Sequence, residues 1–272
     1  MDLYNLPNVT EPPQPMASSL SIPSILLVTT LMVALISLVY WCVQDYRLYM
    51  SLGPGGPPYN IWGWILTSFL VRPFTLAADD TTWTGDYPDF GCHKEIEALP
   101  ERAGERPVVL GIAPQRQFTQ SPGPEMNKRV SSLFATAEQN NSKLLQQRLS
   151  AFERHHVALF VHQILLLSNP ESLPETAIRS GGEIGHLHGE TSLHLYFSPA
   201  DAKVIIDKGW AERHRCARTQ PWWFGWRKYL WSIGDTFLLV YAPRDEAEYD
   251  ILKTLIRASA RFMTGREDIA EP

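Results

Sequence analysis

The sequence predicts an α+β domain with a mostly antiparallel sheet, preceded by one transmembrane helix. The first observation is a long apolar run without charges near the start of the 272-residue chain. The second is a series of short β-rich runs bounded by turn residues. The third is that helix and strand patterns follow one another without strict βαβ alternation. We therefore expect one soluble domain of about 150 to 200 residues behind the apolar run.

The apolar run from Ile22 to Val43 is the first element, and the stretch from Pro12 to Gln44 contains no Asp, Glu, Lys or Arg. As a helix the run would be about 33 Å long, close to the thickness of a bilayer's hydrocarbon core. A cleaved signal peptide is the alternative. However, no basic residue precedes the run, and no A-x-A-like cleavage site follows it. The run therefore predicts a single-pass membrane protein in contact with lipid.

The charges beside the run indicate its orientation. Arg47 follows the run, whereas the preceding tail carries only Asp2 and Glu11. Because basic residues concentrate on the cytosolic side, we expect a cytosolic body. We expect the protein in the endoplasmic reticulum or another endomembrane.

The chain is divided by these patterns into five parts. They are a tail at 1–21, the transmembrane helix at 22–43, a linker and interfacial or irregular segment at 44–106, the α+β domain at 107–264, and a tail at 265–272. Within the linker, Ile61–Val71 is apolar but too short to span a bilayer. It either lies in the membrane interface or covers the core of the domain.

The first half of the domain combines short strands with one longer helical pattern. Val108–Ala113 is rich in β-formers and predicts a strand. Pro124–Ser150 has apolar residues at helical spacings and predicts one long or broken helix. Ala151–Leu167 has a strand-like pattern that ends at Asn169-Pro170.

The second half carries clear helix-start signals. Ser198 is expected to cap a helix that has Pro199 in its first turn and closes at Gly209. A buried strand at Phe237–Ala242 follows. Asp245 is then expected to cap a last helix, which reaches about Met263 and has its inward stripe at Tyr249, Leu252, Ile256 and Ala260.

Charge and cysteine content narrow the function classes. The net charge is -5 and basic residues are scattered, so we expect no nucleic-acid partner. The three cysteines, Cys42, Cys92 and Cys216, show no metal-type spacing, and disulfides do not organise the fold.

Half of the eight histidines lie between Gly181 and His214. His186 and His188 are two residues apart, which places both rings on one face of an extended strand. A turn at 189–192 predicts a hairpin that brings His194 to the same place. Such a cluster binds a metal, moves protons or forms a hydrogen-bonded core network. A metal would use His186, His188 and His194, with Glu183 or Glu190 as a further ligand.

An ordered series of short blocks resembles the fungal luciferases of the mushroom type. The blocks are Asp45-Tyr46 with Gly53-Pro54, Leu99-Pro100 to Arg106-Pro107, Gln115-Arg116-Gln117 with Thr119-Gln120, Phe152-Glu153 with His155, Glu183-Ile184 with His186 and His188, Leu193-His194-Leu195, Lys208-Gly209-Trp210 with Arg213-His214, and Tyr241-Ala242-Pro243-Arg244. Their order and spacing carry the resemblance, which covers most of the chain.

The resemblance implies a membrane-bound enzyme that oxidises a hydroxylated styryl-pyrone, 3-hydroxyhispidin, with O₂ and without a known organic cofactor. In that chemistry a deprotonated enol gives an electron to O₂, a peroxide closes onto the ring, and CO₂ leaves. This requires a base, donors for negative charge and a dry pocket, and histidine and arginine suit the first two roles. The expected catalytic residues are His186, His188, His194, Arg213 and His214. The expected supporting or substrate-binding residues are His155, Glu183, Tyr196, Trp210 and Arg244.

The chain also departs from the family pattern. Arg215-Cys216-Ala217-Arg218 stands where the luminous enzymes have a Pro-Leu-Ala-Gly type turn, and the aromatic insert Pro221–Trp231 follows. We expect this insert to contact the membrane, with a pocket-lining or core role as alternatives. We therefore expect a non-luminous homologue that oxidises a different small aromatic, pyrone or polyketide metabolite, in secondary metabolism.

Several assignments keep a structural alternative. His155 suits a half-buried strand position, and Arg244 suits pairing with a buried acid. We expect no cofactor beyond O₂ and no metal, with a metal on the three clustered histidines as the alternative. For the whole chain, the alternatives to an oxygen-dependent enzyme are a membrane-anchored binding or scaffold protein and, less favoured, a histidine-metal hydrolase.

Overall fold

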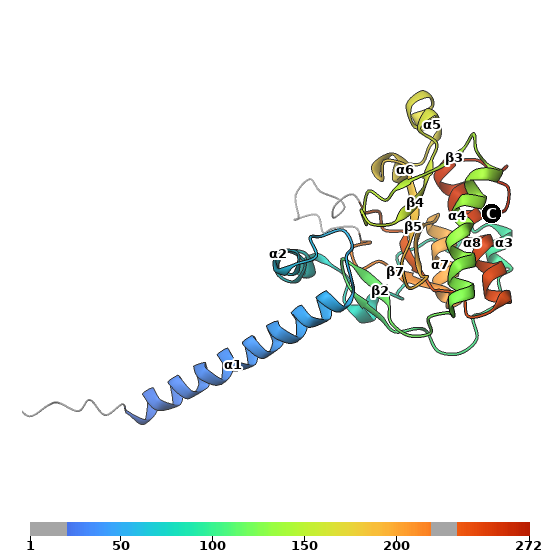
Figure 1. The fold of residues 1–272 in the computed structure, drawn as a ribbon. Helices are drawn as coiled ribbons and strands as arrows, with labels where there is room; N and C mark the ends of the chain where they lie inside the picture. The colour runs from blue at the N-terminus through green and yellow to red at the C-terminus, as the bar shows by residue number, and fades with distance from the viewer. Residues whose placement is uncertain (1–20, 219–232) are drawn as a thin grey trace, which may run out of the picture. The chain divides into compact units, whose positions relative to one another are not determined.

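The computed structural model describes residues 21–218 and 233–272 (Figure 1). It has two units, Met1–Asp45 and Tyr46–Pro272, which are described separately. Helix α1 begins at Ile22 and continues to Ser51. It runs past the predicted end at Val43 because the first residue with a helix-breaking backbone is Gly53, at φ +75°. In the described part of the chain, only α1 is long and apolar enough to cross a membrane, judged by length and composition.

The second unit is built on a six-stranded sheet in which every neighbouring pair is antiparallel, so the predicted fold class is confirmed. In spatial order the strands are β3 Leu145–Leu149, β4 Val157–Val161, β5 Glu183–Leu187, β6 Leu193–Tyr196, β8 Phe237–Val240 and β7 Ala211–Arg213. A separate hairpin pairs β1 Val109–Gly111 with β2 Gln115–Gln117. The predicted strands around 108–113 and 237–242 are thus confirmed.

Helices α4, Pro124–Asn140, and α8, Glu246–Thr264, pack against the sheet (Figure 1). Helix α8 contacts β4, β5 and β6, and α4 contacts β3 and β4. Side chains alternate along a strand, so Leu193 and Leu195 of β6 join the core, while His194 and its partner His186 leave from the other face. One sheet face is therefore apolar core, and the other carries the histidines.

The remaining helical segments are short. They are α2 Ile61–Ile65, the π-helix η1 Leu66–Val71, η2 Arg72–Phe74, η3 Ala78–Asp80, α3 Lys94–Glu97, α5 Gln163–Ser168, η4 Pro170–Ser172, α6 Glu175–Arg179 and α7 Pro199–Asp207. The segment 61–71 has two faces. Val71 is 1 % exposed and joins the core, whereas Trp62 is 71 % and Leu70 62 % exposed.

The predicted helix caps are confirmed. The Ser198 hydroxyl accepts a hydrogen bond from the backbone N–H of Asp201, which starts α7. Asp245 accepts from the N–H of Glu248 and starts α8. Gly265 ends α8 in the left-handed conformation, at φ +62°.

Two predictions between 124 and 167 are wrong at residue level. The helix predicted over 124–150 ends at Asn140, and Leu145–Leu149 is strand β3. Leucines at helical spacing suggested a helix there, but residue-by-residue pairing with β4 determines the structure. The strand predicted over 151–167 is confined to Val157–Val161. Turns precede it, and α5 follows because the His162 ring caps a helix start.

Candidate active site

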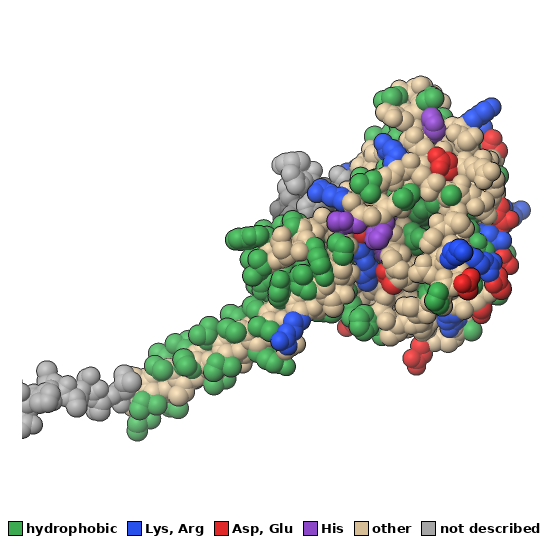
Figure 2. All heavy atoms as spheres, in the orientation of Figure 1, with side chains coloured by type: hydrophobic (Ala, Val, Ile, Leu, Met, Phe, Trp, Pro, Cys, Tyr) green, Lys and Arg blue, Asp and Glu red, His purple; other side chains and the backbone are tan. Residues whose placement is uncertain are grey.

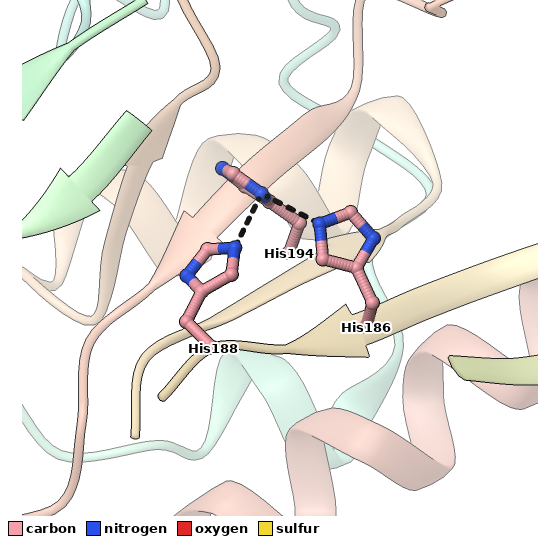
Figure 3. Close-up of side chains that lie close together, drawn as sticks. All are labelled: His186, His188 and His194. Atoms are coloured by element: carbon pink, nitrogen blue, oxygen red, sulfur yellow. Dashed lines mark hydrogen bonds between the residues drawn. The ribbon is translucent and has the colours of Figure 1, made fainter. Parts of the chain in front are cut away.

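The β5–β6 hairpin brings three histidine rings together, as the sequence predicts (Figure 3). His186 and His194 are direct cross-strand partners, and His188 follows the end of β5. His194 Nδ1 lies 3.0 Å from His188 Nε2 and 3.2 Å from His186 Nε2. Each of the three residues is only 2 % exposed. The period-two spacing and the turn therefore produce a compact buried cluster.

Glu183 orients the first ring. His186 Nδ1 lies 2.8 Å from Glu183 Oε1, and because a carboxylate only accepts, the ring nitrogen donates. The same carboxylate accepts from the Ser150 hydroxyl and the Ala151 N–H, both at 2.7 Å. The proton of a neutral His186 is thus fixed on Nδ1, and Nε2 carries a lone pair.

The turn of the hairpin orients the second ring. The Ser192 hydroxyl donates to Glu190 Oε1 at 2.7 Å, so its oxygen is free to accept from His188 Nδ1 at 2.8 Å. This places the lone pair of a neutral His188 on Nε2. Glu190 was considered as a metal ligand from the sequence, but here it supports His188.

Gln115 of β2 orients the third ring, a role that the sequence did not reveal. The amide nitrogen of Gln115 donates to Glu212 Oε1 and to the Arg213 carbonyl, each at 3.4 Å. The amide oxygen then faces His194 Nε2 at 3.2 Å and accepts from it. A neutral His194 therefore has its lone pair on Nδ1. The only sequence signal for Gln115 is its place in the Gln115-Arg116-Gln117 block.

A fourth histidine, His214, joins the group from the end of β7. Its ring centroid lies 4.8 Å from that of His194. The backbone N–H of Cys216 donates to His214 Nδ1 at 3.0 Å, which leaves the proton of a neutral ring on Nε2. His214 is thus a hydrogen-bond donor at Nε2.

Burial lowers the pKa of three of these rings, His188, His194 and His214, and keeps them neutral near pH 7. Desolvation, followed by the charges of neighbouring histidines, lowers the pKa of His214 to about 3 and holds the pKa of His194 well below its ordinary value. Desolvation and the charge of Arg116 lower the pKa of His188 to about 4.

A buried ion pair borders the cluster. Arg116 Nη1 lies 2.8 Å from Glu153 Oε1, and both side chains are less than 10 % exposed. Burial opposes ionisation of Glu153, but the charges of His188 and Arg116 outweigh it and lower its pKa. Sequence reasoning identified neither residue as functional, although each lies in a block that carries the family resemblance.

The histidines meet a cavity of about 520 Å³. Among the described residues, its polar wall consists of Gln115, Glu153, Arg154, Arg179, Ser180, His186, His194 and His214, and its apolar wall includes Pro57, Pro58, Leu66, Phe152, Ile233 and Phe237. His188 is not part of the wall. A cavity of this size suits a small, flat metabolite.

Arg213 lies outside the histidine cluster. It is adjacent to His214 in sequence, so its side chain leaves from the opposite face of the sheet. Its guanidinium pairs with Asp86 at 2.9 Å and donates to the carbonyl of Ala217 at 3.0 Å, and it lies over the ring of Tyr87. All of these contacts are structural.

The supporting residues expected from the sequence divide in two. Glu183 contacts His186, and Tyr196 packs against Phe237, whose ring also lies against His194. The other three residues have no contact with the cluster. Trp210 donates to the Pro100 carbonyl, Arg244 pairs with Glu248, and His155 is exposed in the turn before β4. The structural alternative considered for Arg244 thus matches its observed contacts.

Comparisons with known proteins find similarity to luciferases. A model of the luciferase domain matches residues 181–259, which contain all four clustered histidines. A luciferase of Armillaria gallica is 28 % identical over 228 residues, which is 81 % of each chain. Luciferases of Armillaria mellea and Neonothopanus nambi are 28 % and 26 % identical over similar lengths, 81 % and 80 % of those chains. The chain is a distant homologue of the fungal luciferases.

No solved structure matches this luciferase homologue. The aromatic insert at 221–231, which the sequence assigned to membrane contact, lies outside the described residues. Ile233, directly after the undescribed stretch, lines the cavity.

Proposed function

We propose that this luciferase homologue catalyses the O₂-dependent oxidation of a small hydroxylated aromatic, pyrone or polyketide metabolite. The observation that carries the proposal is a group of four buried histidines with fixed ring orientations, three of which line the cavity. The similarity to fungal luciferases supports oxygen chemistry rather than hydrolysis.

In this proposal His186 acts as the base. Its Nε2 carries the lone pair, and Glu183 at 2.8 Å stabilises the imidazolium that forms when the ring takes a proton. The substrate hydroxyl loses that proton, and the resulting anion is oxidised by addition of O₂, which is reduced to a peroxide on the substrate.

The negative charge of the substrate anion is held by a hydrogen-bond donor in the same cavity wall. The Nε2–H of His214 is such a donor, and no partner for it is found among the described residues. Phe152 and Phe237 provide flat apolar surfaces for an aromatic ring. Burial of the histidine rings lowers the local dielectric constant, which strengthens these interactions.

The proposal includes a membrane location. Helix α1 would anchor the chain, and the exposed side chains of the segment 61–71 would lie in the interface. Hydrophobic side chains gather over α2 and η1 in Figure 2, and Ile61, Trp62, Phe69 and Leu70 are each at least 46 % exposed. Leu66, in the same segment, lines the cavity. An apolar substrate would thus enter from the lipid side.

The test uses membranes that carry the full chain. They are incubated with hydroxypyrones and phenolics while O₂ uptake and product mass are followed. The proposal requires substrate-dependent O₂ uptake that disappears in His186→Ala. Tight binding of these compounds without O₂ uptake would instead support the scaffold alternative.

A further inference from the structure

We infer that His186 Nε2, His188 Nε2 and His194 Nδ1 form a binding site for a divalent first-row transition-metal ion. This goes beyond the proposed function, which uses these rings as acids and bases without an ion. The three nitrogens all lie within 4.8 Å of one another (Figure 3).

In each of the three rings, the nitrogen that would not bind the ion already has a hydrogen-bond acceptor. The acceptors are the Glu183 carboxylate for His186, the Ser192 hydroxyl for His188 and the Gln115 amide oxygen for His194. Metal-binding histidines show this arrangement because an outer acceptor fixes the tautomer and the direction of the lone pair. Here three independent partners leave three unprotonated nitrogens that face one another.

The protons on the three rings cannot satisfy the short contacts between their nitrogens. Hydrogen bonds across the two short N···N contacts, at 3.0 and 3.2 Å, require a proton on His194 Nδ1. A neutral His194 has none there, because its proton lies on Nε2, opposite Gln115. A metal ion bonds to three lone pairs at once and removes this conflict.

The distances between the ring nitrogens also suit a tetrahedral ion. Two nitrogens bound to a tetrahedral ion at about 2.0 to 2.1 Å are about 3.3 Å apart. The two contacts made by His194 Nδ1, at 3.0 and 3.2 Å, are close to that value. The third pair, His186 Nε2 and His188 Nε2, lies within 4.8 Å, so an ion enters with rotation of these rings. The backbone pairing of His186 with His194 holds two of the ligands on rigid strands.

The ligand set indicates the kind of ion. Three neutral imidazoles suit Fe(II), Cu(II) or Zn(II), whereas Mg²⁺ and Ca²⁺ prefer oxygen ligands. The nearest carboxylate oxygen to His188 Nε2 is Glu153 Oε1 at 3.9 Å, and Arg116 already pairs with it. His186 and His194 line the cavity, so the ion would be open to a molecule bound there. A substrate hydroxyl on such an ion loses its proton more readily. Because the ion holds the lone pair of His186 Nε2, it would replace His186 in the activation of the substrate hydroxyl.

The test is metal analysis of the full chain, purified in detergent, with and without reconstitution by Fe(II), Cu(II), Zn(II) or Co(II). We expect about one ion per chain and the absorption bands of tetrahedral or five-coordinate Co(II). His188→Ala should lose the ion, and it is the preferred variant because His188 does not line the cavity. His194→Gln is the second variant, in case His188→Ala does not fold.

His214→Ala is the matched control, since His214 is buried beside the cluster but lies outside the ligand set. It should keep the ion. Glu183→Gln should bind it about 10- to 100-fold more weakly, because only the orientation of His186 is disturbed. No stoichiometric metal with any of the four ions, or equal loss in His214→Ala and His188→Ala, would overturn the site.

The two proposals fail in different measurements. Stoichiometric metal without O₂ uptake would leave the metal site standing and remove the oxidative function. Full O₂ turnover by protein that takes up none of the four ions on reconstitution would overturn the metal site and leave the oxidative function standing.

Discussion

The histidine cluster and Arg213 are both buried and polar, but they differ in how many of their hydrogen-bonding groups have partners. The histidine cluster consists of His186, His188, His194 and His214. Arg213 is 1 % exposed, and its guanidinium donates to Asp86, to the Ala217 carbonyl and to the Trp83 carbonyl. The histidines are also buried, but three of them bring unprotonated ring nitrogens within 3.0 and 3.2 Å of one another, and the fourth has a donor without a partner among the described residues.

This difference assigns a structural role to Arg213 and a binding role to the histidine cluster. Arg213 pairs with a carboxylate and two backbone carbonyls, so it holds Asp86 and β7 in place. The histidine cluster retains bonding capacity at the wall of a cavity, and retained capacity is what a substrate or an ion needs. Burial alone does not distinguish the two groups.

The largest expected effect is on turnover in the histidine cluster. His186→Ala removes the proposed base, so O₂ uptake per folded molecule should fall by about 100- to 10,000-fold. Circular dichroism should show an intact fold. Turnover within threefold of wild type would remove His186 from the proposed chemistry.

Arg213→Ala should lower stability and not turnover per folded molecule. It leaves backbone carbonyls without donors and opens a cavity, so the free energy of unfolding should fall by about 3 to 4 kcal/mol. Chemical denaturation measures this loss. Arg213→Lys should not restore stability, because an ammonium cannot reproduce the forked guanidinium contacts. If Arg213→Lys were as stable as wild type but inactive, Arg213 would belong to the site.

Glu212 accepts a hydrogen bond from the Gln115 amide. Its ionisation is expected to make the stability of the fold depend on pH. Burial, only partly offset by the Tyr241 hydroxyl, raises the pKa of Glu212 from 4.5 to about 7. As pH rises, Glu212 therefore loses its proton at a lower pH in the unfolded chain than in the folded protein. The free energy of unfolding of wild type falls by up to about 3 kcal/mol between pH 4.5 and 7. Below pH 4.5 the residue is protonated in both states and has no effect.

Glu212→Gln should remove this loss. Denaturation at pH 5 and pH 8 should show the variant gaining stability over wild type as pH rises. A constant difference between the two proteins would show that Glu212 ionises normally in the fold.

Glu183→Gln tests the outer contacts of the cluster. The amide keeps the volume but weakens the hydrogen bond that fixes His186, so turnover should fall by about 10- to 100-fold. The pH dependence of turnover should shift with it, because the base loses its partner. An unchanged pH profile with reduced stability would indicate a purely structural role.

The smallest effect is expected for His155→Ala. His155 is exposed in the turn before β4 and has no contact with the cluster. Its removal should change stability by less than about 0.5 kcal/mol and leave turnover as in wild type. It is the matched histidine control for His186→Ala. A tenfold loss of O₂ uptake would place this turn at the cavity during turnover.

Local signals in the sequence predicted much of the site. The period-two spacing of His186 and His188 and the short turn before His194 suffice for the hairpin, because register is fixed by neighbours a few residues away. The Ser198 and Asp245 caps are equally local. The same alternation could have shown that Arg213 and His214 face opposite sides of the sheet.

Contacts between distant segments were not predictable in this way. Gln115 meets His194 from 79 residues away, and Ser150 reaches Glu183 from another strand pair. Leu145–Leu149 has helical spacing but forms a strand, because pairing with β4 overrides the local pattern. The orientation of each ring, on which both proposals depend, follows from such contacts.

The central claim is that the histidine cluster carries oxygen chemistry. The most direct measurement supplies isotopically labelled O₂ to membranes bearing wild type, His186→Ala or His155→Ala, with a panel of hydroxypyrones and phenolics, and analyses the products by mass. We expect a labelled product with wild type and His155→Ala and none with His186→Ala. A product without label, or one formed equally by His186→Ala, would contradict the claim.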